Sequence, residues 1–395
     1  MLAIVGGRIL TITRGEMDGG TVLVDGSRIV AVGRDVAVPA GATIVDASGK
    51  YVMPGLIDAH THVGIAEEAQ GWAGNDVNEM TDPVTAHLRA VDAINPEDEG
   101  FRDAVKGGVT SLQINPGSAN VIGGQTVAVK AFGRTIDEMV LRQPAGLKAA
   151  LGENPKRVYG DQKKAPSTRM GSAAVLREWL VKAQNYTEKL EKQAKGDADK
   201  PFERDLRLEA IAGVLRHEYP LRLHAHRADD IMTALRIRDE FDLPMSIEHC
   251  TEGFKVADEL AKRGIPAMVG PTLTARTKVE LRDRSLRTPG LLAMAGVKVA
   301  IITDHWVVPI QHLIVSVILA VKEGLDSDEA LKAVTINPAE IIGVAERVGS
   351  LEAGKDADIQ VLSGHPLDIM SRAERVYVGG RLAYEWDAER SHSEA

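Results

Sequence analysis

The 395-residue chain is long enough for a large core with an added domain, and its 44% hydrophobic and 26% charged residues are ordinary for a soluble globular protein. A net charge of −9 and an aromatic content of 4% argue against a surface that binds nucleic acid, and no apolar run of about 18 residues is present to span a membrane. The single cysteine, Cys250, excludes an internal disulfide and favours a reducing, cytoplasmic location.

Residues 1–53 are predicted to form short strands. β-Branched runs such as LAIVGGRILTI and ATIVDASGKYV are broken by Gly-Gly, Asp-Gly and Ser-Gly. The opening MLAIVGGRILTIT lacks the basic, apolar and small-residue order of a signal peptide, so we interpret it as a strand. Residues 346–395 repeat this pattern, as in DADIQVLSG and RVYVGGRLAYEW. We expect the two ends to build one small β-sandwich.

The middle of the chain, residues 54–345, alternates apolar strands with helical segments, which is typical of βα units and a parallel sheet. Eight candidate strands fit a closed (β/α)8 TIM barrel: LIDAHTH, VTSLQIN, TVAVKAF, GLKAALG, LRLHAH, MSIEHC, IPAMVG and KVAIITD. The third, TVAVKAF, fits least well and could instead form half of a hairpin with TIDEMVL. A highly charged helical insertion at about 156–205 would be either a solvated surface helix or a lid over the site.

His60 and His62 stand two residues apart at the end of the first candidate strand. Side chains two apart on a strand point to the same face, so both imidazoles would converge on one point. Such a pair is half of a metal site, although histidines two apart also arise by chance. The interpretation therefore depends on residues at matching positions elsewhere.

His224, His249 and Asp304 occupy those matching positions. Each follows an apolar strand and precedes polar, helix-opening residues, so each would lie at the C-terminal face of the barrel, where the chemistry of this fold takes place. Neutral imidazoles bind zinc-like ions, and a bound metal lowers the pKa of water towards neutrality to give hydroxide. Asp304 is the candidate metal ligand and general base that carries a proton to the leaving nitrogen.

Lys148 and Glu153 compete for a further oxygen-donor position. Lys148 lies within the apolar strand GLKAALG, where an ammonium is costly to bury, and Glu153 follows at the end of that strand. Lys148 would need carboxylation by CO2 to bridge two metals, and the strand count favours it over Glu153. A single-metal site remains a third option.

Together these motifs resemble the amidohydrolase superfamily over nearly the whole chain. PGLIDAHTH resembles its first-strand signature, and VGSLEAGKDADIQVL resembles the return from barrel to sandwich. The chain looks closest to the imidazolonepropionase-like and dipeptidase-like branch. The resemblance implies hydrolysis of an amide, lactam or dipeptide C–N bond of a small molecule by metal-activated hydroxide. It also implies one or two divalent ions, zinc first with manganese, cobalt or iron as alternatives, and two metals where Lys148 is carboxylated.

Five further residues are candidates for substrate binding, each with a plainer alternative. His226 shares the face of His224 but could cap a helix. Tyr159 could donate to an oxyanion or simply pack, and Arg169 could bind a substrate carboxylate or lie on the surface. Gln125 could line the pocket beside glycines that shape a turn, and His305 could orient Asp304 or pack behind it.

Two other functions use the same features. A deaminase of a ring amidine would share the metal site, although His224 is not followed by the His-x-x-Glu usual for those enzymes. A non-catalytic scaffold relative would have lost its ligands, whereas the expected ligands are present here. The expected partners are a small-molecule substrate and further copies of the chain in a homo-oligomer, with no nucleic acid and no membrane.

Overall fold

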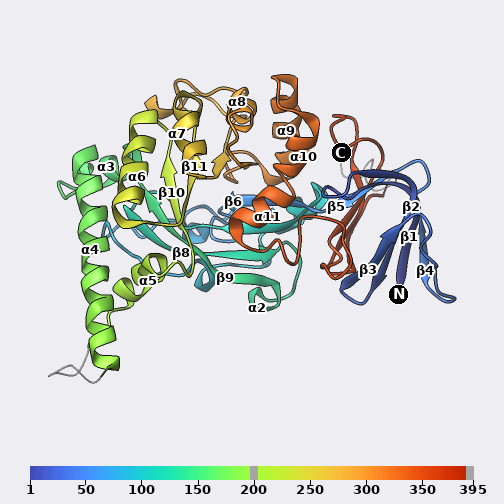
Figure 1. Ribbon diagram of the computed structural model, residues 1–395, viewed down its shortest axis with the longest axis horizontal. Helices are drawn as coiled ribbons and strands as arrows, with labels where there is room; N and C mark the ends of the chain where they lie inside the picture. The colour runs from blue at the N-terminus through green and yellow to red at the C-terminus, as the bar shows by residue number, and fades with distance from the viewer. Residues whose placement is uncertain (196–202, 388–395) are drawn as a thin grey trace.

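A computed structural model describes residues 1–195 and 203–387 (Figure 1). Two sheets organise these residues: a barrel surrounded by helices in the centre of Figure 1 and a second sheet at the right, where the blue N-terminal and red C-terminal strands lie together. In the described part of the chain, no helix combines the length and the apolar character needed to cross a bilayer.

The second sheet, here called the terminal sheet, joins both ends of the chain, as predicted. Among the described residues it has eight strands: β1 (Leu2–Leu10), β2 (Glu16–Asp25), β3 (Arg28–Gly33), β4 (Thr43–Asp46), β5 (Tyr51–Pro54), β14 (Ile359–Leu362), β15 (Ala373–Val378) and β16 (Arg381–Glu385). The two ends meet where β5 pairs antiparallel with β14. Alternating apolar residues such as Ile4, Val22 and Ile359 form its buried core.

The barrel sheet also has eight strands in the described residues and keeps them in chain order. They are β6 (Leu56–Thr61), β7 (Val109–Ile114), β8 (Ile122–Lys130), β9 (Val140–Ala150), β10 (Leu221–Ala225), β11 (Met245–His249), β12 (Ala267–Val269) and β13 (Val299–Ile301). The first and last strands approach through a bridge between Thr61 and His305, which brings the ends of the sheet together. The barrel architecture that the strand pattern predicted is therefore confirmed.

One strand departs from the expected parallel order. β8 runs antiparallel to both β7 and β9, so TVAVKAF does form half of a hairpin and an all-parallel barrel is wrong. Its partner is β9 and not the whole of TIDEMVL, because residues Ile136–Met139 of that segment form α2. The physical reason is the short connection: residues 131–139 hold only the four-residue helix α2, too little chain for the crossover that a parallel strand needs. The remaining strand pairs in the barrel are parallel.

Helices cover the outside of the barrel, and α4 stands at the left edge of Figure 1. They are α1 (Glu99–Lys106), α2 (Ile136–Met139), α3 (Glu153–Asp161), α4 (Arg169–Ala194), α5 (Leu206–Leu215), α6 (Ala228–Phe241), α7 (Ala257–Lys262), α8 (Thr288–Met294), α9 (Leu313–Lys322), α10 (Ser327–Lys332) and α11 (Ile336–Ile342). Short 3-10 turns are η1 (Gly71–Gly74), η2 (Ala90–Asp92), η3 (Gly253–Val256), η4 (Val279–Leu281) and η5 (Ile310–His312).

The predicted insertion at about 156–205 takes in α3 after its first three residues, all of α4 and the residue that caps α5. Thr168 caps α4 by accepting from the Gly171 amide, and Asp205 caps α5 in the same way. Residues 196–202 of the insertion, and residues 388–395 at the end of the predicted sandwich, lie outside the described residues.

Candidate metal centre

His60 and His62 project from the end of β6 towards Asp304. The Nε2 atoms of His60 and His62 lie 3.2 and 3.3 Å from Asp304 Oδ1. The Nδ1 of His62 lies 2.7 Å from the Asn115 carbonyl, which can only accept, so this nitrogen donates. The Nε2 of His62 faces Asp304 at the centre of the site, and in the neutral imidazole this is the nitrogen left to bind a metal.

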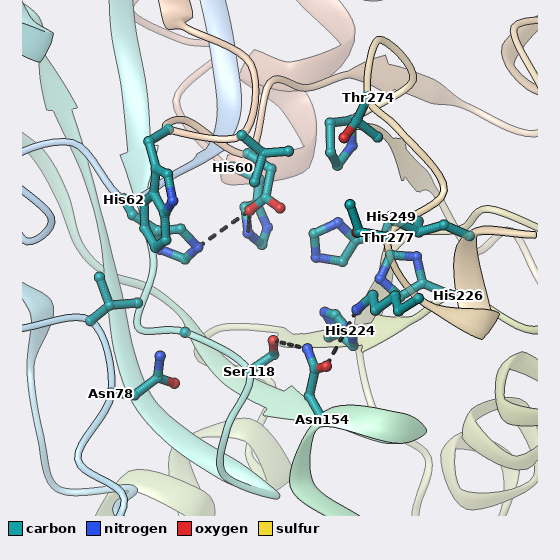
Figure 2. A pocket seen from close by; sticks show the side chains of 18 of the residues that line it. His60, His62, Asn78, Ser118, Asn154, His224, His226, His249, Thr274 and Thr277 are labelled. Carbon is teal, nitrogen blue, oxygen red and sulfur yellow. Dashed lines mark hydrogen bonds and ion pairs between the residues drawn. The ribbon is translucent and has the colours of Figure 1, made fainter. Parts of the chain in front are cut away.

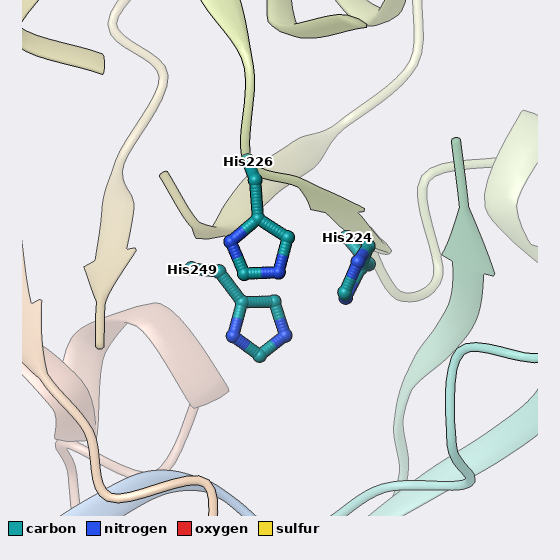
Figure 3. Close-up of side chains that lie close together, drawn as sticks. All are labelled: His224, His226 and His249. Atoms are coloured by element: carbon teal, nitrogen blue, oxygen red, sulfur yellow. The ribbon is translucent and has the colours of Figure 1, made fainter. Parts of the chain in front are cut away.

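A second group of imidazoles comes from β10 and β11 (Figure 3). Ring centroids are 4.4 Å apart for His224 and His249, 4.7 Å for His224 and His226, and 4.8 Å for His226 and His249. His249 donates through Nδ1 to the Gly270 carbonyl at 2.9 Å, which turns its Nε2 away from the backbone. His249 also stands 4.8 Å from His60, so it joins the two groups.

His249 reaches the site because the backbone turns at this residue. Glu248, just before it, is fully buried and contacts His60 and Lys148 inside the barrel. Regular alternation would point His249 to the opposite face. Instead His249 and Cys250 adopt φ values of 66° and 48°, an unusual conformation for such residues that ends the strand and redirects both side chains.

Lys148 and Glu248 form an ion pair beneath the histidines. The Lys148 ammonium contacts Glu248 Oε2, and the same oxygen lies 3.0 Å from His60 Nδ1. All three side chains are almost completely buried. Burial opposes ionisation of Glu248, but the charges of Lys148 and His60 overcome it and hold the pKa of this carboxyl far below its ordinary range.

Burial sets the charge of the remaining site groups. It lowers the pKa of His249 to about 3 and that of His224 well below its ordinary value, so both imidazoles are neutral at physiological pH. Burial works against ionisation of Asp304 as well, yet His249, His60 and His62 hold its pKa well below the ordinary range. His224 and His249 therefore present neutral nitrogen donors beside the ionised carboxylate of Asp304.

These residues line one cavity of about 260 Å³ at the C-terminal mouth of the barrel (Figure 2). Its lining joins the histidine cluster to polar side chains that include Asn78, Ser118 and Asn154. Lys148 contributes from below, and the loop after β12 contributes from the side. The size of the cavity suits a small molecule.

The donor set fits a divalent metal. Both ring nitrogens of His224 are buried and have no hydrogen-bond partner in the described residues, a costly state unless a ligand binds there. Two groups bring ligand atoms within 4.8 Å of one another: His224 with His226 and His249, and His60 with His249 and Asp304. Imidazoles with one carboxylate are typical ligands of zinc and related ions.

Comparison with known proteins decides the family. The amidohydrolase family matches residues 51–383. The chain belongs to the amidohydrolase family.

Individual relatives agree with this assignment. The amidohydrolase tasK of Hapsidospora irregularis is 30% identical over 93% of this chain, although the chain spans only 40% of that protein. The imidazolonepropionase of Mesorhizobium japonicum is 26% identical over 92% of this chain and 90% of its own. The solved structure of an amidohydrolase from Thermotoga maritima is 45% identical, with a TM-score of 0.94, over 98% of this chain and 100% of that one. The chain is therefore a hydrolase of C–N bonds with imidazolonepropionase-like relatives.

Several residues predicted from the amidohydrolase sequence lie outside the cavity lining. Glu153 begins α3, and its amide donates to Glu280. Tyr159 is buried and donates to Asn120 at 2.5 Å; burial raises its pKa to about 12. Arg169 pairs with Asp230 at 3.1 Å near the start of α4.

Gln125 and His305 also lie away from the cavity of the amidohydrolase. Gln125 pairs with Leu147 in the β8–β9 hairpin. His305 is buried behind Asp304: its Nδ1 accepts from the Ile310 amide, and its Nε2 lies 3.3 Å from Glu68. Of the predicted substrate-binding residues, His226 alone lines the cavity, and its Nδ1 lies 2.8 Å from the Thr251 hydroxyl.

Sequence reasoning missed Glu248 and Lys278 in this amidohydrolase. Glu248 carried a usable signal, because a charged residue inside the apolar strand MSIEHC is as unusual as Lys148 in its own strand. Lys278 lies in the irregular loop after β12, and no local pattern marks it. The cavity lining also includes Trp306 next to Asp304, which has no motif of its own.

Proposed function

We propose that this amidohydrolase cleaves an amide, lactam or dipeptide C–N bond of a small molecule at a site of one or two divalent ions, with zinc as the first candidate. The observation that carries the proposal is the convergence of His60, His62, His224, His249 and Asp304 on one cavity at the barrel mouth. The names of the relatives in this family support C–N hydrolysis as the reaction.

Two groups of residues would hold the metal. His60, His249 and Asp304 form one group, with His62 beside Asp304. His224, His226 and His249 form the other, in which we propose His224 and His249 as ligands. Lys148 is the proposed bridge if it is carboxylated, in preference to Glu153, because Lys148 lines the cavity and Glu153 does not. A bound metal would lower the pKa of water and polarise the scissile carbonyl.

The chain itself supplies orientation and proton transfer. The Asn115 and Gly270 carbonyls accept from Nδ1 of His62 and His249 and so orient these rings, and Glu248 Oε2 lies 3.0 Å from His60 Nδ1. Asp304 is ionised and lines the cavity, so it can accept a proton from the attacking water and pass it to the leaving nitrogen.

Asp304→Asn tests this role. The amide keeps the shape of the side chain but cannot accept the proton, so kcat should fall by about 10²- to 10⁴-fold. The measurement is turnover of N-acyl amino acids, dipeptides and lactams, together with metal content by mass spectrometry and folding by circular dichroism. Asp35→Asn, at an exposed residue of the terminal part, is the matched control. Full turnover in the Asp304 variant with its fold intact would refute the mechanism.

We further propose a cytoplasmic location and a homo-oligomeric state. The lone Cys250 is buried, which suits a protein that works without disulfides. Sedimentation of the purified chain would test its assembly.

A further inference from the structure

The cavity has two unlike ends. One end holds the histidine cluster and Asp304, and Asp304 is the acidic residue among the described lining residues. The other end, here called the polar wall, consists of Asn78, Ser118, Asn154 and Lys278. A small substrate whose C–N bond lies at the histidines would extend its remaining groups towards this wall.

Lys278 gives the polar wall a positive charge. Of the described residues that line the cavity, Lys148 and Lys278 are the cationic ones, and the Lys148 ammonium is engaged by Glu248 below the site. Lys278 Nζ lies 3.3 Å from Asn154 Oδ1 and 3.3 Å from Glu280 Oε2. An ammonium has three donors, so these two acceptors hold it in place and leave one donor for the cavity.

The contacts around Lys278 are already ordered before a substrate arrives. Asn154 donates to Ser118 Oγ at 2.8 Å, which fixes the amide so that its oxygen faces Lys278. Glu280 also accepts from the Glu153 amide and lies 3.8 Å from Arg169, so its charge is shared among several donors. Arg169, which the sequence suggested for binding a substrate carboxylate, pairs with Asp230 outside the cavity. It is therefore not available to a substrate in the cavity.

We infer that Lys278 binds a carboxylate of the substrate, which makes the substrates small amides that carry a carboxylate beside the scissile bond, such as N-acyl amino acids and dipeptides. The inference rests on the proposed function. A single ammonium that keeps one donor free of Asn154 and Glu280, beside amide and hydroxyl groups of the wall, matches one carboxylate. Lys278 is the one cation among the described residues of the wall, whereas a phosphate group is usually held by several.

Paired substrates test this inference. Each N-acetyl amino acid is compared with its neutral carboxamide, and acetate release is measured with metal-reconstituted protein. We expect the wild type to prefer the acids, and Lys278→Met to lower kcat/KM for the acids by about 10- to 100-fold, mainly through KM. The acid-to-carboxamide ratio should fall towards one, and Lys278→Arg should restore part of it. Lys255→Met removes the same charge at an exposed pair with Asp283 and should keep the wild-type ratio.

Two results would overturn the inference: a wild type that prefers the neutral carboxamides, or a Lys278→Met variant that loses acids and carboxamides equally. If the proposed function itself is wrong, the result differs: neither the wild type nor any variant would release acetate from the N-acetyl amino acids or from their carboxamides. Calorimetric titration of the acids into metal-loaded protein decides that case. Binding that is lost in Lys278→Met supports carboxylate recognition, and absence of binding to the wild type refutes it.

Discussion

Lys148 and Glu248 place opposite charges inside the barrel, where desolvation is expensive. Lys148 is 1% exposed and Glu248 is fully buried, so each depends on the other for compensation. The pair also touches His60, one of the proposed ligands. Lys148 and Glu248 therefore have two roles: they fill the interior of the barrel, and they contact a histidine of the site.

Glu248→Gln tests this dependence. The substitution leaves the Lys148 ammonium without a carboxylate, and we expect metal-free protein to lose about 3–5 kcal/mol of unfolding free energy in urea denaturation. Glu340→Gln, in a partly exposed pair with Lys298, should change it by less than about 1 kcal/mol. Equal stability of the Glu248 variant and the wild type would show that the buried pair does not matter. Replacing both members, as Lys148→Met with Glu248→Leu, should recover part of the loss.

The loop between β12 and α8 is the element that covers the cavity. Pro271, Thr274, Thr277, Lys278 and Leu281 of this loop all line it, whereas the described part of the insertion contributes no lining residue. The insertion helix α4 instead approaches the loop from outside, where Arg169 lies 3.8 Å from Glu280. The loop between β12 and α8, and not the described part of the insertion, therefore lies over the cavity as a lid would.

Glu280 anchors this loop. Its buried carboxylate accepts from the Glu153 amide at 2.5 Å and pairs with Lys278, which ties the loop to the start of α3. Glu280→Ala should free the loop, and we expect trypsin to cut native protein at Arg276 or Arg282 about tenfold faster. Glu340→Ala is the control at an exposed site. An unchanged rate and pattern of cleavage would mean that other contacts hold the loop.

At the scale of the whole molecule, Lys130 connects the barrel to the return segment of the terminal sheet. It ends β8, and its buried ammonium lies 2.9 Å from Asp356 and 2.5 Å from Asp358. Burial opposes ionisation of Asp356, but Lys130 and then Arg347 hold its pKa below the ordinary 3.8. The stability from this group is complete above that pH and is lost as the pH falls through the lower folded value.

Lys130→Met should therefore uncouple the two sheets. We expect a loss of about 3–5 kcal/mol in unfolding free energy at neutral pH, because two carboxylates lose a buried partner. The difference from the wild type should shrink as the pH falls through the lowered pKa of Asp356, where that carboxylate becomes protonated. Lys50→Met removes a more exposed partner of Glu374 and should cost less than about 1 kcal/mol. A Lys130 variant as stable as the Lys50 variant would contradict this account.

Local patterns predicted much of this architecture. Strand alternation and turn residues predicted the barrel, the terminal sheet and the convergence of His60, His62, His224, His249 and Asp304. The barrel is confirmed, and these five side chains line one cavity because the C-terminal ends of parallel strands meet at one face whatever lies between them. Their roles as ligands and base stay a proposal. The same reasoning could not set the direction of β8, because the choice between hairpin and crossover depends on the length of chain available between strands.

What the sequence by itself determined is the set of residues that a parallel barrel brings to its mouth, since periodicity is a local property of the chain. Only the tertiary structure decided which charges are already engaged. It paired Arg169 with Asp230, joined Lys148 to Glu248 and left Lys278 beside the cavity. Partners of this kind come from segments far apart in the chain, and their selection depends on distance and burial, which no local pattern encodes.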